Sequence, residues 1–232
     1  MTENPTSLRG KVLSGLFWKV LENGGVQIVQ FVISLILARM LGPERYGTIA
    51  LLLVFIAIAN VFIQSGFQTA LIQKRQVDDL DYSSVFYLGL GVALLLYAVI
   101  FAGAPAVAAF YHDPELKSML RVLALMIFFG AVVSVQTAMV SRKMEFRKMC
   151  AASLFATCLS GIAGVIGAYR GLGTWALVVQ QLGTQFLLMV FLWVLVGWKP
   201  MRAFSFSRVK ALFSYGWKLL CSSLLDTVYN NL

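Results

Sequence analysis

Polar side chains recur on one face of the first long apolar stretch of the sequence. Their spacings are four, four, three and four residues, and the positions are Lys19, Asn23, Gln27, Gln30 and Ser34. This spacing predicts that they lie on one side of an α-helix. Amide side chains donate and accept hydrogen bonds, and a lysine binds anions. The row therefore has the chemistry to bind a ligand that is rich in hydroxyl groups or negatively charged.

A polar row on an otherwise apolar helix must face protein or water, because facing lipid is costly. One interpretation is that the row forms hydrogen bonds with neighbouring helices, each contributing roughly 0.6–2 kcal/mol. The other is that it forms the wall of a hydrated cavity. The length of the row favours the cavity.

Other apolar stretches carry similar groups. A second row with a spacing of four residues begins near the end of the sequence and contains Ser214, Lys218, Ser222, Asp226 and Asn230. We predict that the substrate-binding side chains are Lys19, Asn23, Gln27, Gln30, Asn60, Gln64, Gln181, Gln185 and Lys218. For Lys19 the alternative is an interfacial anchor that extends to the membrane surface, and for Lys218 it is pairing with Asp226.

Glu22 is the one acidic residue near the membrane in the first six apolar stretches. Intramembrane acids carry coupling protons or cations in transporters, so Glu22 is a coupling candidate, as is Asp226. The alternative is that Glu22 forms an ion pair with Lys19 or Arg9.

An enzymatic function has little support in the sequence. It contains no Gly-rich phosphate loop followed by Lys-Ser/Thr. The acids Asp78, Asp79 and Asp81 could bind Mg²⁺, but we expect them to cap a helix and balance Lys74 and Arg75. The three cysteines all lie in apolar stretches without metal-site spacing. We therefore predict no catalytic residue, cofactor or metal.

Composition indicates that lipid is the solvent for these elements. Of 232 residues, 59% are hydrophobic and 12% are charged, and the mean hydropathy is +0.81. A membrane helix needs about 20 apolar residues. Five windows contain no charged residue, and a first span precedes them at 20–41; the windows are 46–73, 82–111, 122–141, 149–169 and 171–198. We predict an all-α integral membrane protein with six complete transmembrane helices and the start of a seventh near 209.

Lysine and arginine placement predicts the orientation. With a cytoplasmic N-terminus, the outer side has five basic residues, at 39, 45, 117, 121 and 170. The cytoplasmic side has thirteen, at 9, 11, 19, 74, 75, 142, 143, 147, 148, 199, 202, 208 and 210. The net charge of +9 is thus a signal of topology and of anionic lipid. Nucleic-acid binding is disfavoured, because the basic residues are divided among short loops.

A weak internal repeat suggests that a second unit begins after residue 200. The words Phe17-Trp18-Lys19-Val20-Leu21 and Gly216-Trp217-Lys218-Leu219-Leu220 share Trp-Lys-x-Leu, six spans apart. Parallel repeats are common in transporters. We expect a six-helix lobe at 1–200, and a cytoplasmic loop with the start of a second lobe at 201–232. The chain would then be the N-terminal half of a longer protein or a truncated form.

Two stretches carry a family resemblance. The sequences Leu-Ala-Arg-Met-Leu-Gly-Pro-Glu-Arg-Tyr-Gly at 37–47 and Ile-Gln-Ser-Gly-Phe-Gln-Thr-Ala-Leu-Ile-Gln-Lys-Arg at 63–75 resemble polysaccharide-biosynthesis membrane proteins. These are flippases and exporters of lipid-linked oligosaccharides, related to the multidrug and toxic compound extrusion transporters. The chain most resembles the colanic acid and teichuronic acid exporters.

The resemblance implies two six-helix lobes around a central cavity in the bacterial cytoplasmic membrane. It further implies transport of an undecaprenyl-diphosphate-linked oligosaccharide between leaflets, with polysaccharide polymerase and glycosyltransferases as candidate partners. On this basis the amides would bind sugar hydroxyls and the lysines the diphosphate. The alternatives are a drug/cation antiporter of the same superfamily, which needs an acid deep within a lobe, and a membrane scaffold that transports nothing.

Overall fold

The computed structural model describes residues 5–63, 68–74 and 77–208, together with residues 222, 225 and 229. In these ranges the chain is helical and contains no strand. The elements are α1 (Pro5–Leu41), α2 (Pro43–Ile63), α3 (Thr69–Gln73), α4 (Asp79–Phe110), α5 (Glu115–Leu123), α6 (Met126–Lys143), α7 (Phe146–Tyr169) and α8 (Thr174–Val196).

The predicted all-α membrane architecture is confirmed. Within the described ranges, six helical stretches are long and apolar enough to span a membrane: Ser14–Leu41, Pro43–Ile63, Asp79–Phe110, Glu115–Lys143, Phe146–Tyr169 and Thr174–Val196. The predicted seventh helix lies almost entirely outside the described residues.

Two predicted boundaries are wrong. The window 46–73 contains two helices, because α2 ends at Ile63 and α3 is a separate short helix. The 21 residues of α2 rise about 31 Å, which already crosses a hydrocarbon core of about 30 Å. The fourth span begins at Glu115 rather than at 122, because α5 precedes α6 and places its charged residues near the outer end.

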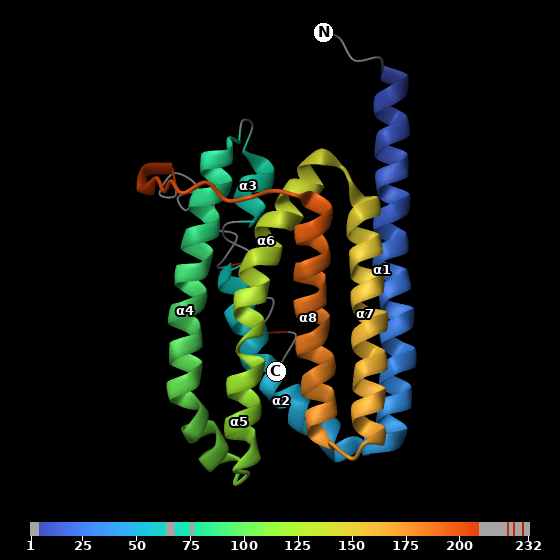
Figure 1. Ribbon diagram of the computed structural model, residues 1–232, viewed down its shortest axis with the longest axis vertical. Coiled ribbons are helices and arrows are strands. Elements are labelled where there is room, and N and C mark those ends of the chain that lie inside the picture. Colours follow the sequence, from blue (N-terminus) through green and yellow to red (C-terminus); the bar gives the residue numbers. More distant parts are fainter. Residues whose placement is uncertain are drawn as a thin grey trace.

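The helices form an upright bundle (Figure 1). In that view α4 lies at one edge and α1 at the other, while α2 runs behind the others. The long α1 extends past its neighbours at the end where the N-terminus lies. The loops before α4 and α7 and the segment after α8 lie at this same end, so the basic loops predicted to be cytoplasmic all lie on one side (Figure 1).

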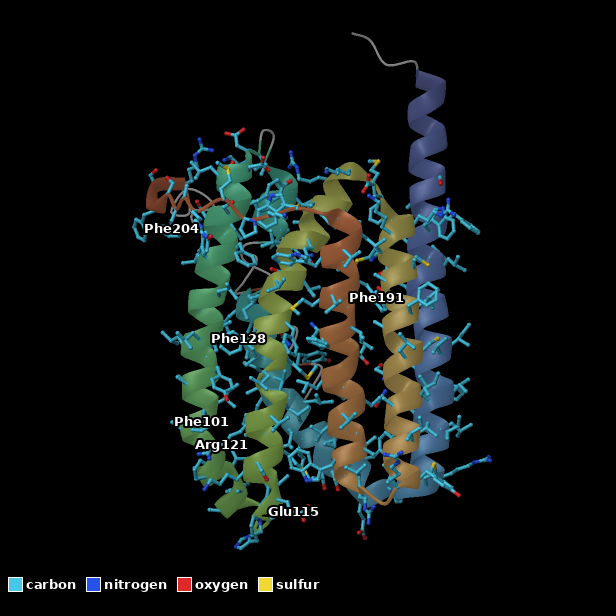
Figure 2. The ribbon with its side chains drawn as sticks, in the orientation of Figure 1. Phe101, Glu115, Arg121, Phe128, Phe191 and Phe204 are labelled. Carbon is cyan, nitrogen blue, oxygen red and sulfur yellow. The ribbon has the colours of Figure 1, made fainter. Side chains whose placement is uncertain are left out.

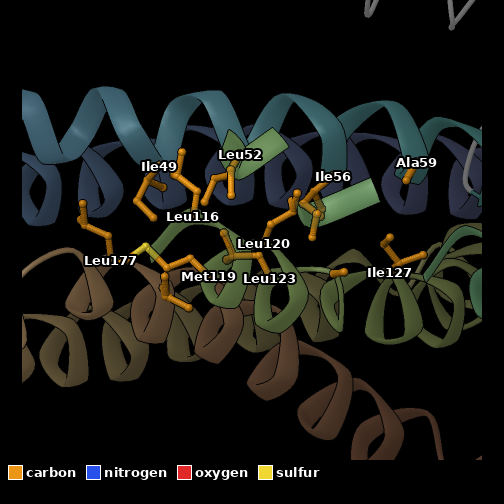
Figure 3. Packing of buried hydrophobic residues seen from close by; sticks show 14 of the residues in the cluster. Ile49, Leu52, Ile56, Ala59, Leu116, Met119, Leu120, Leu123, Ile127 and Leu177 are labelled. Atoms are coloured by element: carbon orange, nitrogen blue, oxygen red, sulfur yellow. The ribbon is translucent and has the colours of Figure 1, made fainter. Parts of the chain in front are cut away.

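The largest core lies where α2 crosses α5, α6 and α8. The buried residues of α2 recur at spacings of three and four, at Ile49, Leu52, Ile56, Ala59 and Ile63. They face the buried side chains of α5, among them Leu116, Met119, Leu120 and Leu123 (Figure 3). The other faces of α2 are also mainly apolar and include the exposed Leu51 and Phe55, as expected of a helix that borders lipid.

Small residues recur along α7, and their spacing predicts close helix packing; this small-residue stripe consists of Ser153, Ala156, Ser160, Gly164 and Gly167. It brings three helices into close contact. The α1–α7 and α7–α8 pairs have the most extensive contacts of the bundle. The Ser160 and Thr184 hydroxyls are 2.6 Å apart across α7 and α8. On the α1 side, a Cβ atom at Gly161 would overlap Cδ1 of Ile33. The expectation that these small residues serve helix packing is therefore confirmed.

We predict that Gly161→Ala weakens the α1–α7 contact, because the added methyl overlaps Ile33. Overpacking of this kind costs about 1–3 kcal/mol. The measurement is the thermal unfolding temperature in detergent micelles. Adding Ile33→Ala should restore much of the loss. Gly103→Ala is the control, because nothing lies within 4 Å of a Cβ atom there. Equal stability of Gly161→Ala and the unchanged protein would contradict the prediction.

A proline in α4 creates a backbone acceptor that α5 satisfies. Pro105 has no N–H to donate to the carbonyl of Phe101, four residues earlier. The Arg121 guanidinium donates to this carbonyl from Nε and Nη2, each at 3.3 Å. Its carbon also lies 3.8 Å from the centre of the Phe101 ring, and Figure 2 shows the two side chains together. Arg121 thus joins α4 to α5 at a point where lipid offers the carbonyl no partner.

We predict that Arg121→Ala destabilises the protein by about 1–3 kcal/mol, because the Phe101 carbonyl loses a charged donor. In a Pro105→Ala background the same substitution should cost less, since the backbone N–H of an alanine restores the helical donor. A double-mutant cycle of unfolding free energies measures the difference. If the free-energy changes of Arg121→Ala and Pro105→Ala are strictly additive, Arg121 does not replace the backbone donor that Pro105 lacks.

Candidate functional site

The polar row of α1 lies beside the seam at which α1 packs against α7. The seam is marked by the buried residues Gly15, Glu22, Ile33 and Leu37. Asn23 and Gln27 are exposed, whereas Lys19, Gln30 and Ser34 are partly exposed. The row rises about 22 Å from Lys19 to Ser34, most of the thickness of a hydrocarbon core. Within the described part of the chain, its central amides are not covered by another helix.

Two adjoining hollows follow this row. One has a volume of about 420 Å³ and is lined by Gln27, Ile28, Gln30, Phe31 and Ser34. The other has a volume of about 210 Å³ and is lined by Glu22, Asn23, Val26, Gln27 and Ser153. Gln27 borders both, so the two hollows adjoin along α1, and Ile28 and Phe31 make the lining of the larger one mainly apolar. Tyr46 of α2 closes one end by donating a hydrogen bond to the Ser34 carbonyl at 3.0 Å.

Glu22 is buried in the seam, with only 6% of its surface exposed. Its Oε2 forms an ion pair with Nζ of Lys19 at 2.9 Å, and Ser153 of α7 donates a hydrogen bond to its Oε1 at 3.3 Å. The pairing of Glu22 with Lys19 was one of the two expected arrangements. Lys19 remains partly exposed, so one side of the ion pair is accessible and the other is enclosed by protein.

Ser153 is a residue that the sequence did not mark as functional. It was expected to serve only helix packing, as part of the small-residue stripe. Its hydroxyl and the Glu22 carboxylate are 131 positions apart in the chain. Predicting this contact requires knowing which face of α7 packs against α1. The helical period of either segment alone does not give that information.

Asn60 and Gln185 lie apart from the α1 row, where α2 and α8 meet α6. The contact is at Gly130 of α6. A Cβ atom at this glycine would lie 2.7 Å from Asn60 Oδ1 and 3.7 Å from Gln185 Nε2. Asn60 Oδ1 is buried and has no hydrogen-bond partner among the described residues. The predicted binding residues therefore divide into a row along α1 and an amide pair inside the lobe.

The remaining predicted residues have different settings. Gln181 is partly buried on α8, whereas its neighbour Gln180 is 3% exposed and packs over Gly164. Gln64, Lys218 and Asp226 lie outside the described residues. The ligand roles of all these side chains stay predictions.

The acids at the start of α4 hold the cytoplasmic end together. Asp81 is fully buried and accepts hydrogen bonds from Lys74 Nζ at 2.6 Å and from the Asp78 N–H at 3.1 Å. Arg208 binds Asp78 at 2.9 Å and Asp81 at 3.3 Å, and these hydrogen bonds raise the pKa of its guanidinium. The expected capping and the charge balance with Lys74 are confirmed, whereas Arg75 lies outside the described residues and Arg208 is the second basic partner. No group of side chains suited to a metal ion occurs in the described ranges.

Helices of this length and apolarity, with basic loops at one end, define a multi-pass membrane protein. The model of one family, described as polysaccharide biosynthesis protein, matches residues 36–232. The chain belongs to this family, as the stretches at 37–47 and 63–75 predicted. No solved structure matches the chain.

Three relatives illustrate the similarity. The succinoglycan biosynthesis transport protein ExoT of Rhizobium meliloti is 27% identical over 97% of this chain and 45% of its own length. The teichuronic acid biosynthesis protein TuaB of Bacillus subtilis is 23% identical over 97% of this chain and 47% of its own. The lipopolysaccharide biosynthesis protein WzxC of Escherichia coli is 22% identical over 62% of this chain and 29% of its own length. The chain thus spans about half the length of the first two.

Proposed function

We propose that this chain forms one lobe of a transporter that moves an undecaprenyl-diphosphate-linked oligosaccharide across the bacterial cytoplasmic membrane. The observation that carries the proposal is the row of amides on α1, which lines open hollows instead of packing against a helix of the lobe. The names of the relatives, all concerned with making or transporting polysaccharides, support this cargo over a drug or a cation.

The setting of the row supports a wet passage. Asn23 and Gln27 are exposed, and Val20, Ile28 and Phe31, which adjoin the row on the same helix, are exposed by 66–71%. Apolar side chains can face lipid, but uncovered amides in hydrocarbon are costly. The amide side of α1 therefore faces water, or a second lobe across a water-filled space.

The cargo has three chemically distinct parts. Its sugars offer hydroxyl groups, its diphosphate is anionic, and its polyprenyl tail is apolar. The amides at Asn23, Gln27 and Gln30 can exchange hydrogen bonds with hydroxyls in either direction. The diphosphate requires a cation, and Lys19 supplies one at the cytoplasmic end of the row. The tail stays in lipid beside the protein.

The ion pair in the seam suggests how binding is coupled to a second ion. In the empty protein Lys19 neutralises Glu22 at 2.9 Å. A diphosphate competes for the exposed side of Lys19 and withdraws this partner from the carboxylate. Glu22 then retains only the Ser153 hydroxyl, and an unpaired carboxylate in a buried seam is costly. Taking up a proton relieves that cost, so cargo loading and protonation of Glu22 occur together.

The amide pair inside the lobe has a different role in this proposal. Asn60 and Gln185 approach each other across Gly130, away from the hollows along α1. Asn60 Oδ1 has no hydrogen-bond partner among the described residues, so it can accept a hydrogen bond from a passing hydroxyl when the helices separate. Polysaccharide polymerase and glycosyltransferases, which consume and supply the cargo, are the proposed partners of the whole protein.

We predict that Lys19→Ala and Gln27→Ala both slow transport of a lipid-linked oligosaccharide in a leaflet-resolved vesicle assay. The full-length protein should lose roughly ten- to hundredfold with Lys19→Ala, because a charged contact worth roughly 1.5–3 kcal/mol disappears. Gln27→Ala removes a neutral hydrogen bond worth about 1 kcal/mol and should cost about fivefold.

Val20→Ala is the matched control, since Val20 adjoins Lys19 but is an exposed apolar residue. Its rate should equal that of the unchanged protein. Unchanged rates for both Lys19→Ala and Gln27→Ala would remove the row from the mechanism and leave the chain as a scaffold.

We predict that Glu22→Gln makes transport insensitive to an imposed proton gradient, because the amide cannot take up a proton. Transport in vesicles is measured without a gradient and with a proton gradient of either direction, in which the vesicle interior is more acidic or more alkaline than the medium. Ser153→Ala should keep the response, because it removes only a hydroxyl donor and leaves the carboxylate in place.

Glu44→Gln serves as the control because Glu44 is an exposed acid in the first turn of α2. It should respond to the gradient like the unchanged protein. A full response in Glu22→Gln would exclude Glu22 as the coupling residue while leaving the transport proposal intact.

A further inference from the structure

The segment after α8 is held tightly against the cytoplasmic end of α4. The helix α8 ends at Gly197, whose positive φ of 65° turns the chain away from the bundle axis. Trp198 then packs beside Tyr82 and Phe86, with ring centres 6.2 and 6.0 Å away. In Figure 1 the segment runs from α8 across the bundle to α4. Residues 198–208 are called the linker below.

Main-chain and charged groups attach the linker to α4. The N–H of Met201 donates to Ser83 Oγ at 2.9 Å, and the N–H of Ser205 donates to Ser84 Oγ at 3.0 Å. Both serines are fully buried. Arg208 completes the attachment through its ion pairs with Asp78 and Asp81. Because the backbone provides most of these contacts, the side chains between them point elsewhere.

Most of the exposed linker side chains are apolar or basic, and Ser207 is the exception. Met201, Phe204 and Phe206 are 49%, 50% and 69% exposed. Lys199 and Arg202 are exposed as well. Phe204 lies beyond α4, on the side away from α8 (Figure 2). This is the outer edge of the bundle, where α4 presents exposed leucines and valine to the surroundings.

We propose that the linker is a membrane-surface anchor that binds the anionic lipid headgroups of the cytoplasmic leaflet. Its two phenylalanines enter the boundary between headgroups and acyl chains, and Lys199 and Arg202 bind the lipid phosphates. Aromatic side chains among basic ones, held level with the membrane surface, are the pattern that binds such a boundary.

Two observations favour lipid over a cytoplasmic protein as the occupant. The exposed phenylalanines lie at the edge where α4 already faces lipid, so they extend an apolar surface that the bilayer covers. The cations beside them complement anionic phospholipid, whereas Asp78 and Asp81 are both occupied by basic side chains. The linker thus presents the bilayer with apolar and positive groups.

The test places a nitroxide label at position 206 through Phe206→Cys, after replacing the native cysteines by alanine. A label introduced by Ser207→Cys is the control on the adjacent exposed residue. The full-length protein is measured in nanodiscs of phosphatidylcholine, with or without phosphatidylglycerol. We expect the label at 206 to be several-fold more accessible to oxygen, relative to an aqueous nickel chelate, than the label at 207.

Adding phosphatidylglycerol should move the label at 206 deeper into the bilayer. The double substitution Lys199→Gln and Arg202→Gln should abolish this effect of the anionic lipid. Equal chelate accessibility at 206 and 207 in both lipids would overturn the proposal. Protection of position 206 in native membranes but not in nanodiscs would also overturn it, because a protein would then be the occupant. Neither result bears on transport, so the two proposals fail independently.

Discussion

Within a bilayer, every polar group needs a partner from the protein or from water, and this requirement organises the lobe. Ser134, Thr157 and Ser160 donate to carbonyls of their own helices. Arg121 supplies the donor that Pro105 removes from α4. Arg142 of α6 likewise binds carbonyls at the end of α3, including those of Leu71 and Ile72. The two arginine contacts also join separate elements, so at these points one hydrogen bond both satisfies an isolated carbonyl and holds two helices together.

Against this background the central amides of α1 are exceptional. The polar side chains of α7 and α8 hydrogen-bond at close quarters, and their helices pack tightly. Asn23 and Gln27 have no such role in the described lobe, although each could have been an apolar residue facing lipid at no cost. Retaining amides there is justified by a partner beyond the lobe: water, the cargo or a second lobe. The same reasoning separates this row from Asn60 and Gln185, which are partly buried beside Gly130 of α6.

Much of this architecture could be predicted from the sequence. A helix in lipid is recognised by the length of its apolar stretch, by the charged residues at its ends and by the face on which its polar side chains recur. Apolar windows predicted six spans, and small residues on α7 predicted its close contacts. The start at Glu115 escaped prediction because charge-free windows locate only the minimum of a span, and Arg121 has a carbonyl partner near the outer end. The contact of Glu22 with Ser153 escaped for another reason. A helical period shows which residues share a face, but not which face of a distant helix it meets.

The order of groups along α1 has a consequence for the proposed transport. A cation paired with a buried acid lies at the cytoplasmic end, amides follow at nearly every turn, and a serine lies at the outer end. A cargo that enters from the cytoplasm has its charge neutralised first and its hydroxyls bound afterwards. Because successive amides offer similar weak hydrogen bonds, no position along the row holds the sugar much more tightly than the next. Passage through a site requires such binding, strong enough to replace water and weak enough to release. Lys19 alone could trap the cargo, and Glu22, ready to reclaim that lysine, limits how long it does.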